Sequence, residues 1–397
     1  MIIGNPPWVT NSSLSVLNSG NLPKKNNFCR LKGFDAKTGK SNFDIAEWML
    51  IKLIESLPIK KASRLAMLCK TSTARKVLKY FWQNNNRIDN SSIHLIDAKK
   101  HFNISADACL FVTSICKSNK NINKSAYIYG DLSFTKEIRR FGISNNDLVA
   151  DMDGFDKYKS IDGANCYKWR SGIKHDAIKV MELVKDGDSY KNGFGEIVSI
   201  EPNYIFPLLK SSDLSNNRLI PSKYMIVTQK KINKDTSAIK TTAPNTWNYL
   251  IRHSQILDNR KSRIYKKHFR FSIFGVGAYS FSKWKVAVSG FHKKIFFRAV
   301  GSYNNKPIML DDTCYFFPCY SKKQALFIEK LLNSKACLNF LESLIFFDAK
   351  RPVTIDILKR IDLIKLSEVN GRFDTILKHP DYFEPYGTKI EKSLFKA

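Results

Sequence analysis

The chain opens with Met1-Ile-Ile-Gly-Asn-Pro-Pro-Trp8. The two isoleucines predict a short buried strand that ends at Gly4. Each proline fixes φ and has no N–H, so the Asn5-Pro6-Pro7 backbone is stiff and offers carbonyl oxygens without competing donors. Trp8 adds a broad apolar face at the same rim. A rigid set of acceptors beside an aromatic ring suits a planar ring that bears an amino group better than it suits a phosphate or a metal.

These residues have a specific chemistry toward adenine. The exocyclic amine of adenine is a poor nucleophile, because its lone pair is delocalised into the ring. The Asn5 side-chain oxygen and the Pro6 carbonyl are two acceptors for its two hydrogens. They would favour the pyramidal nitrogen that attacks a methyl group. The alternative is a proline-stiffened turn after a strand, which the same residues fit equally well.

The segment Asn5-Pro6-Pro7-Trp8 resembles the catalytic (D/N/S)PP(Y/F/W) motif of amino-group DNA methyltransferases. Asparagine in first place is typical of the enzymes that methylate adenine at N6. The resemblance implies that Asn5, Pro6, Pro7 and Trp8 are catalytic, that Asn5 and the Pro6 carbonyl hold the target amine, and that Trp8 stacks on a flipped adenine. It also implies S-adenosylmethionine as the methyl donor, with Asn5 and Phe43 as its candidate contacts in this chain.

Three later segments continue the resemblance. Residues 41–50 match the family's helix after the catalytic loop, and residues 65–69 match its next core strand. Residues 101–112 resemble the segment whose aromatic forms the other side of the base sandwich. Phe102 is therefore the candidate second stacking residue. An ordinary core phenylalanine before a strand is the alternative for Phe102.

The charge points to the class of partner. A formal net charge of +30 and an isoelectric point near 9.7 call for a polyanion, most simply nucleic acid, and the resemblance implies that it is double-stranded DNA. A membrane surface fits less well, because the basic residues do not gather on one amphipathic helix. The densest basic stretch, residues 252–298, contains a single acid, Asp258. Its predicted DNA contacts are Arg252, Arg260, Lys261, Arg263, Lys266, Lys267, Arg270, Lys283, Lys285, Lys293, Lys294 and Arg298.

Composition also bears on where the protein is located and on the state of its cysteines. No apolar run is long enough to cross a bilayer, and the first residues lack the basic and apolar regions of a signal peptide. The eight cysteines are scattered, without a C-x-x-C pair or a paired Cys/His spacing. We therefore expect a cytoplasmic protein with reduced thiols, without a disulfide framework or a metal site.

Apolar spacing and the Gly, Pro and Asn breaks predict the elements. Residues 9–40 predict a long loop, and Ser41 with Asp44 resembles a capping box before a helix that Pro58 stops. In the first half we further expect strands at 65–69, 93–96 and 109–113, a helix at 74–82, and a passage into a second domain at 130–160. In the second half we expect strands at 224–228, 273–281, 286–288 and 295–300 and helices at 323–333 and 336–346.

The alternation of strands and helices predicts the fold class α/β. We expect a partial Rossmann-like methyltransferase sheet in residues 1–150, as the C-terminal part of a catalytic domain. A mixed α+β domain for DNA target recognition should follow in residues 155–397. This layout resembles the gamma class of adenine methyltransferases. Residues 167–176 resemble the entry to its recognition domain, and residues 332–355 resemble the closing helices.

One departure from the gamma class concerns the cofactor loop. In that class a glycine-rich S-adenosylmethionine loop precedes the catalytic motif, whereas four residues precede Asn5 here. Gly193-Phe-Gly195 and Gly275-Val-Gly277 lack a third glycine, and residues 33–41 do not have the glycine spacing of a P-loop. We therefore expect the N-terminal half, which binds most of the cofactor, to be a separate subunit or to be missing from a truncated reading frame. The chain should be inactive without it.

The sequence thus predicts a site-specific DNA adenine-N6 methyltransferase, as a subunit or truncated form, of a restriction–modification system. Two alternatives remain. The chain is a non-catalytic target-recognition subunit, or it is the modification and specificity part of a combined restriction enzyme and methyltransferase.

Overall fold

The structure, a computed structural model, describes residues 1–8, 45–58, 63–84, 87–104, 106–115, 123–133 and 137–383. It forms two compact units. The first contains residues 1–157 and Glu342–Ala349, and the second contains residues 158–341 and 350–397. The predicted division lies between 150 and 155, close to the boundary at 157, but the prediction did not include the return of residues 342–349 to the first unit.

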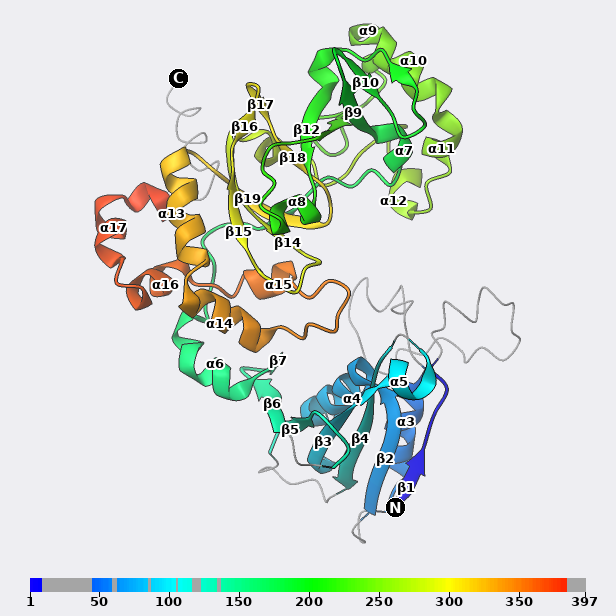
Figure 1. The fold of residues 1–397 in the computed structure, drawn as a ribbon, viewed down its shortest axis with the longest axis vertical. Coiled ribbons are helices and arrows are strands. Elements are labelled where there is room, and N and C mark those ends of the chain that lie inside the picture. The colour runs from blue at the N-terminus through cyan, green and yellow to red at the C-terminus, as the bar shows by residue number, and fades with distance from the viewer. Residues whose placement is uncertain are drawn as a thin grey trace. The chain divides into compact units, whose positions relative to one another are not determined.

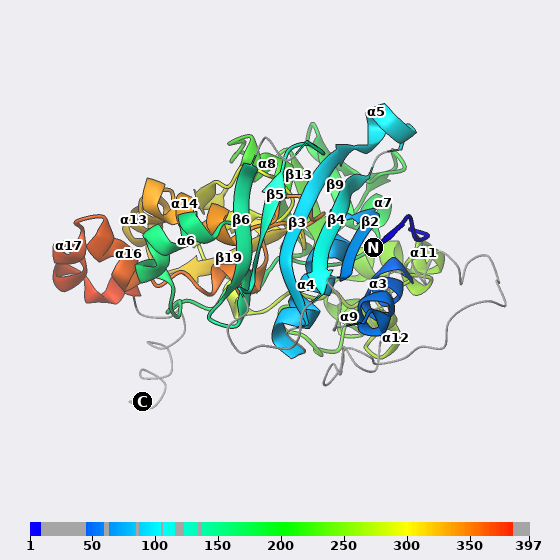
Figure 2. The ribbon, with the colours of Figure 1, turned by 90° about the horizontal axis from the view of Figure 1, so that it is seen from below.

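The first unit is built on a seven-stranded sheet with the order β1-β2-β4-β3-β5-β6-β7. Figure 2 shows most of these strands side by side. β1 runs parallel to β2 and β3 runs parallel to β5, whereas the other neighbours are antiparallel. The strands are β1 (Ile2–Gly4), β2 (Ser63–Lys70), β3 (Ile88–Asp97), β4 (Asp107–Ile115), β5 (Ser125–Tyr129), β6 (Glu137–Ser144) and β7 (Asp147–Val149).

Two amphipathic helices cover one face of this sheet (Figure 2). They are α3 (Ile45–Ser56) and α4 (Thr71–Asn84). The buried residues of α4 recur at helical spacing, which places them on one side of the helix. On β2, Leu65, Met67 and Cys69 are buried in the same core, while Arg64 on the other face is exposed. The buried core residues of α4 are Ala74, Val77, Leu78, Phe81 and Trp82.

Most predicted elements of this half are confirmed. The strands predicted at 65–69, 93–96 and 109–113 are β2, β3 and β4, and the helix predicted at 74–82 is α4. The predicted capping box at Ser41 and Asp44 and the loop at 9–40 lie outside the described residues. The expected passage at 130–160 is wrong in part, because β6 and β7 extend the sheet here and bury Phe141 in the core. Helix α6 (Met152–Tyr158) follows them.

The segment Glu342–Ala349 joins this unit although it lies far along the chain. The Ser343 carbonyl accepts hydrogen bonds from the N–H groups of Ala150 (2.8 Å) and Asp151 (2.9 Å). Asp348 accepts two hydrogen bonds from the Arg75 guanidinium at 2.8 and 2.7 Å. The first unit is therefore assembled from two segments that are far apart in the sequence.

The second unit contains a six-stranded sheet, β11-β10-β9-β13-β12-β18, and a four-stranded sheet, β15-β14-β19-β8. A two-stranded ribbon joins β16 (Ser302–Tyr303) to β17 (Lys306–Pro307). Together with the first unit, these sheets make a mixed α/β protein. The larger sheets consist of β8 (Arg170–Ser171), β9 (Glu182–Asp186), β10 (Ser189–Lys191), β11 (Ile197–Val198), β12 (Ile205–Leu209), β13 (Lys223–Ile226), β14 (Trp284–Ser289), β15 (Phe297–Val300), β18 (Met309–Leu310) and β19 (Cys314–Cys319).

Short helices surround these sheets (Figure 1). The helices predicted at 323–333 and 336–346 are confirmed as α13 and α14, although α14 ends before the predicted limit. The helices are α7 (Ile178–Met181), α8 (Ser211–Ser215), α9 (Ile239–Thr242), α10 (Pro244–Arg252), α11 (Ser254–Asp258), α12 (Arg263–Lys266), α13 (Lys322–Leu332), α14 (Lys335–Leu344), α15 (Ile355–Leu358), α16 (Leu363–Val369) and α17 (Phe373–Lys378).

The strand predicted at 273–281 is wrong. This segment forms an isolated bridge between Lys174 and Phe274 and then a 3-10 helix, η3 (Ala278–Phe281). The reason lies at Gly275, which has a φ of +71°, and a Cβ there would lie 2.2 Å from the Gly172 carbonyl oxygen. The positive φ and the close approach of the two backbones turn the chain where a strand would have to continue. The other three predicted strands match β13, β14 and β15.

Candidate active site and nucleic-acid interface

The Asn5–Trp8 motif begins where β1 ends. Ile2, Ile3 and Gly4 pair in register with Leu65, Ala66 and Met67 of β2, so the strand delivers Asn5 to the carboxyl edge of the sheet. Asn5 and Pro7 are exposed, Pro6 is buried and Trp8 is half-buried. The Asn5 amide is thus accessible, as the predicted contact with a substrate amine requires.

Two hydrogen bonds tie Trp8 to the neighbouring strand. Its indole N–H donates to the Leu68 carbonyl at 3.2 Å, and the Lys70 ammonium donates to the Trp8 carbonyl at 3.4 Å. The indole therefore has its polar atom satisfied and leans toward β2. Lys70 was not among the predicted site residues. The sequence feature that could have indicated Lys70 is a basic residue at the end of a buried strand.

The topology brings the predicted stacking residues to one edge of the sheet. Because β1, β2 and β3 point in the same direction, their carboxyl ends share that edge. Helix α5 (Ala98–Phe102) follows β3 there, and Figure 1 shows it beyond the strand ends. In open α/β sheets, ligands bind outside the carboxyl ends of the strands. Trp8 and Phe102 both follow strands whose carboxyl ends lie at this edge.

Phe102 is 49% exposed, so it is not an ordinary core phenylalanine. Asp97 caps α5 by accepting a hydrogen bond from the Lys100 N–H (3.0 Å), and Asn103 ends it with a φ of +53°. Three strand spacings separate β1 from β3 in the sheet, a distance of about 14 Å. Phe43, the other predicted cofactor contact, lies outside the described residues.

Some of the predicted DNA contacts are exposed cations without an ion pair, whereas others are bound to groups of the protein itself. Arg270 forms an ion pair with Asp258 at 2.6 Å, and this hydrogen-bonded partner raises the pKa of its guanidinium. Arg298 is half-buried and donates to the Leu214 carbonyl at 3.3 Å. The exposed cations, for which the structure gives no ion pair among the described residues, are Arg252, Lys261, Arg263, Lys266, Lys267, Lys283, Lys293 and Lys294.

Two predicted DNA contacts must be corrected. Arg260 is 6% exposed and donates to the carbonyls of His175 (3.2 Å) and Ser272 (2.9 Å). Lys285 is 1% exposed and donates to the carbonyls of Ser282 (2.8 Å) and Ile308 (3.0 Å). Burial lowers the pKa of the Lys285 ammonium to about 7. Both side chains satisfy buried backbone oxygens, so we remove them from the predicted interface.

The second unit contains a cleft of about 1100 Å³ that reaches from α7 and α11 to α8 and the turn before β19. Its lining includes Glu182, which forms an ion pair with Lys210 at 2.6 Å and lies 3.5 Å from His175. Burial by itself raises the pKa of the Glu182 carboxyl, but hydrogen bonds from His175 and Lys210 outweigh burial and leave the pKa lowered. Charge density alone did not indicate this cleft, because its lining mixes acids, bases and amides.

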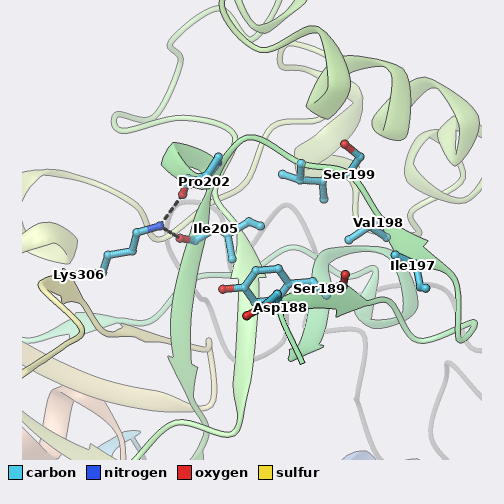
Figure 3. A pocket seen from close by; sticks show the side chains of 10 residues that line it. Asp188, Ser189, Ile197, Val198, Ser199, Pro202, Ile205 and Lys306 are labelled. Carbon is cyan, nitrogen blue, oxygen red and sulfur yellow. Dashed lines mark hydrogen bonds between the residues drawn. The ribbon is translucent and has the colours of Figure 1, made fainter. Parts of the chain in front are cut away.

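A smaller cavity of about 510 Å³ lies beside β10, β11 and the start of β12 (Figure 3). Lys306 supplies its cation, but the ammonium is held by the carbonyls of Pro202 (2.5 Å) and Ile205 (2.9 Å). The Lys306 ammonium thus satisfies two backbone carbonyls of the protein, and we assign this cavity no ligand.

Among the residues that the structure describes, no group of His, Cys, Asp and Glu side chains could hold a metal ion. None of the described helices has the length and apolar character needed to cross a bilayer. Six cysteines fall within the described ranges, and all six are free thiols.

Comparison with known proteins identifies the family. No family model matches the sequence. Type II methyltransferase M.NspV of a Nostoc species is 45% identical over 371 residues, which are 93% of this chain and 76% of that protein. The chain belongs to the Type II methyltransferase family. The match includes a large share of both units, since it leaves out 7% of the chain.

Solved structures of restriction-modification enzymes also match the chain, but weakly. MmeI, a Type IIL restriction-modification enzyme in complex with DNA, is 12% identical with a TM-score of 0.47, covering 94% of this chain. The DrdV–DNA complex is 10% identical with a TM-score of 0.39, covering 80% of this chain. The chain spans 54% of MmeI and 36% of DrdV. Scores of this size do not assign a fold.

Proposed function

We propose that this chain carries the catalytic motif and the target-recognition unit of a DNA methyltransferase that modifies adenine at N6 in a restriction–modification system. The observation that carries the proposal is the exposed Asn5 at the carboxyl end of β1, followed by a buried Pro6 and an anchored Trp8, in a member of the Type II methyltransferase family.

Asn5 and Pro6 would act on the amine of the target base. The Asn5 side-chain oxygen and the Pro6 carbonyl each accept one N–H of the exocyclic amine, which localises the lone pair on nitrogen. The new bond forms between that nitrogen and the methyl carbon, the bond from sulfur to the methyl carbon breaks, and the nitrogen afterwards loses one proton. The rate enhancement comes from positioning and from fixed dipoles.

Trp8 and Phe102 would hold the target base outside the duplex. Extruding a base costs about a few kcal/mol. Stacking on an aromatic side chain returns about 1–3 kcal/mol per base. Trp8 can offer a ring face without leaving a buried N–H unsatisfied, because the Leu68 carbonyl already accepts that N–H.

S-adenosylmethionine supplies the methyl group as an electrophilic sulfonium. Of the predicted cofactor contacts, Asn5 is described and its exposure fits such a role. We find no glycine-rich loop between a strand and a helix in the described residues that would hold the rest of this cofactor. We therefore propose that a further methyltransferase segment, on another chain or on the same longer protein, supplies that loop.

The edge of the sheet supports such a partner segment. β1 is the first strand in the sheet order and pairs with β2 alone among the described strands. Its Ile3 side chain is 67% exposed on the face that α3 and α4 do not cover. An edge strand with free N–H and C=O groups is a template for pairing with another strand.

The experiment is the substitution Asn5→Ala in an enzyme reconstituted with a segment that carries a glycine-rich cofactor loop. Removing one preorganised acceptor should lower methylation by at least about 10²–10³-fold and leave DNA binding nearly unchanged. Asn84→Ala, at an exposed asparagine at the end of α4, is the matched control and should keep full activity. Nucleoside analysis of the product by mass spectrometry should show N6-methyladenine.

Three other outcomes of this experiment would each contradict a different part of the proposal. Full methylation by the Asn5→Ala variant would remove Asn5 from its role. Methylcytosine in the product would refute adenine specificity. DNA binding without methylation, in the presence of every candidate partner, would instead indicate a non-catalytic recognition subunit.

A further inference from the structure

Two amide side chains, one on α11 and one on the residue that caps its C-terminus, face the larger cleft of the second unit. Gln255 and Asn259 both line it and are exposed, as is Ile256 between them, at 41%. The Asn259 N–H donates to the Gln255 carbonyl at 3.2 Å, so the backbone is still helical between them and the two side chains share one face. The structure gives neither amide a hydrogen-bond partner among the described residues.

The charged groups of the cleft are, in contrast, largely paired with one another or with cations beside it. Lys179 and Lys261 also line the cleft, and the structure gives neither an ion pair among the described residues. The wall formed by α11 offers neutral groups that both donate and accept hydrogen bonds. The ion pairs are Glu182 with Lys210 (2.6 Å), Asp176 with Lys174 (2.9 Å) and Asp312 with Arg351 (3.3 Å).

Free cations flank α11 along the chain. Arg252 is the last residue of α10, and Lys261, Arg263, Lys266 and Lys267 follow α11 in and around α12. All five are exposed. Figure 1 shows α10, α11 and α12 in succession on one side of this unit. Neutral amides flanked by cations resemble the arrangement at DNA interfaces. There, side chains that contact phosphates set the register of the protein on the duplex, and side chains that contact base edges determine which sequence is recognised.

We propose that Gln255 and Asn259 read base edges in the major groove of the DNA target while the flanking cations bind phosphates; this rests on the proposed function. An Asn or Gln amide makes a bidentate pair with N6 and N7 of adenine, and an apolar side chain contacts the methyl group of thymine. With Ile256 between the two amides, the recognised sequence contains A·T base pairs at the positions that α11 faces.

The test is a binding selection with the full-length chain. The probe is a library of DNA duplexes with a randomised centre, and the bound fraction is sequenced. The wild-type chain should enrich one motif that contains A·T pairs. Gln255→Ala and Asn259→Ala should each reduce the preference at one A·T position by about fivefold to 150-fold, with the other positions unchanged.

Two further variants separate base reading from folding. Gln255→Glu should redirect the preference at its position toward C·G, because a carboxylate accepts from the cytosine amine, and a folding defect cannot produce a new preference. Asn245→Ala, at an exposed asparagine on α10 away from the cleft lining, should select the wild-type motif. A wild-type motif that persists in the two alanine variants and in Gln255→Glu would overturn this inference alone. A wild-type chain that enriches no motif would overturn target recognition by this chain and the inference with it.

Discussion

The Arg75–Asp348 ion pair gives a direct test of how the first unit is held together. Arg75, on α4, donates to both carboxylate oxygens of Asp348 at 2.8 and 2.7 Å, and the two side chains are 10% and 18% exposed. The guanidinium also lies 4.3 Å from the centre of the Phe346 ring. We expect Asp348→Asn to leave this buried cation without a counter-charge.

The expected loss follows from the burial. Breaking a buried ion pair from one side costs about 3–5 kcal/mol, because the remaining charge stays desolvated. Asparagine keeps one acceptor oxygen for the guanidinium, and the Phe346 ring still faces it. We therefore expect Asp348→Asn to lower the free energy of unfolding of the first unit by about 2–4 kcal/mol.

An exposed ion pair in the same unit provides the control. Arg140 and Asp153 lie 2.7 Å apart, but their side chains are 29% and 64% exposed. Asp153→Asn should cost less than about 1 kcal/mol, since solvent screens this pair.

Hydrogen exchange with mass spectrometry measures the two variants, because tryptophans occur in both units and fluorescence would mix them. Peptides from α4 and from residues 342–349 should exchange faster in Asp348→Asn, while peptides from the second unit should not. Equal protection of α4 in the two variants would refute the argument that burial makes the Arg75 pair strong.

Two further predictions concern the second unit. Lys285 has a pKa of about 7 in the folded chain, against an ordinary value of 10.5. Between these pH values the unfolded chain binds more protons, so stability should rise with pH, by about 1.4 kcal/mol per pH unit at most. Urea unfolding at several pH values should show this rise in the wild-type chain relative to Lys285→Met, and parallel curves for the two proteins would contradict it. Replacing Arg263, Lys266 and Lys267 by alanine should weaken DNA binding for all sequences and reduce the slope of log K against log salt by about 3. The same change at Lys359, Lys365 and Lys378, which are exposed on or beside α15–α17, should leave the slope near its wild-type value, and an equal loss in both triple variants would refute a localised interface.

Local sequence patterns were enough to predict the main helix and strands in the core of the first unit. Helix α4 was predictable because its apolar residues recur with the period of a helix, and β2 was predictable because it is short, apolar and bounded by breaks. The Asn5–Trp8 motif was visible for a similar reason, since two prolines fix the backbone whatever surrounds them. That Asn5 is exposed while Pro6 is buried depends on pairing with β2, which lies far along the chain.

Net charge did not show which cations of the basic stretch are accessible. Lys285 looked like one more cation of a basic stretch, but β14 is covered on both faces and buries it between two backbone carbonyls. Arg260 is buried in the same way under Tyr265, whose ring lies 3.7 Å from the guanidinium carbon. A sequence gives the sign of a side chain, whereas its accessibility depends on the elements that pack around it.

The sequence by itself determined the chemistry that the chain can offer: a stiff asparagine–proline clamp, an excess of cations, and the helices and strands whose apolar residues recur at a regular period. The tertiary structure decided which of those groups act together. It set Trp8 and Phe102 at one edge of a sheet, returned Asp348 to Arg75, and opened a cleft beside Gln255 and Asn259. The physical reason is that backbone stiffness and side-chain charge are local properties, while burial and proximity depend on contacts between residues distant in sequence.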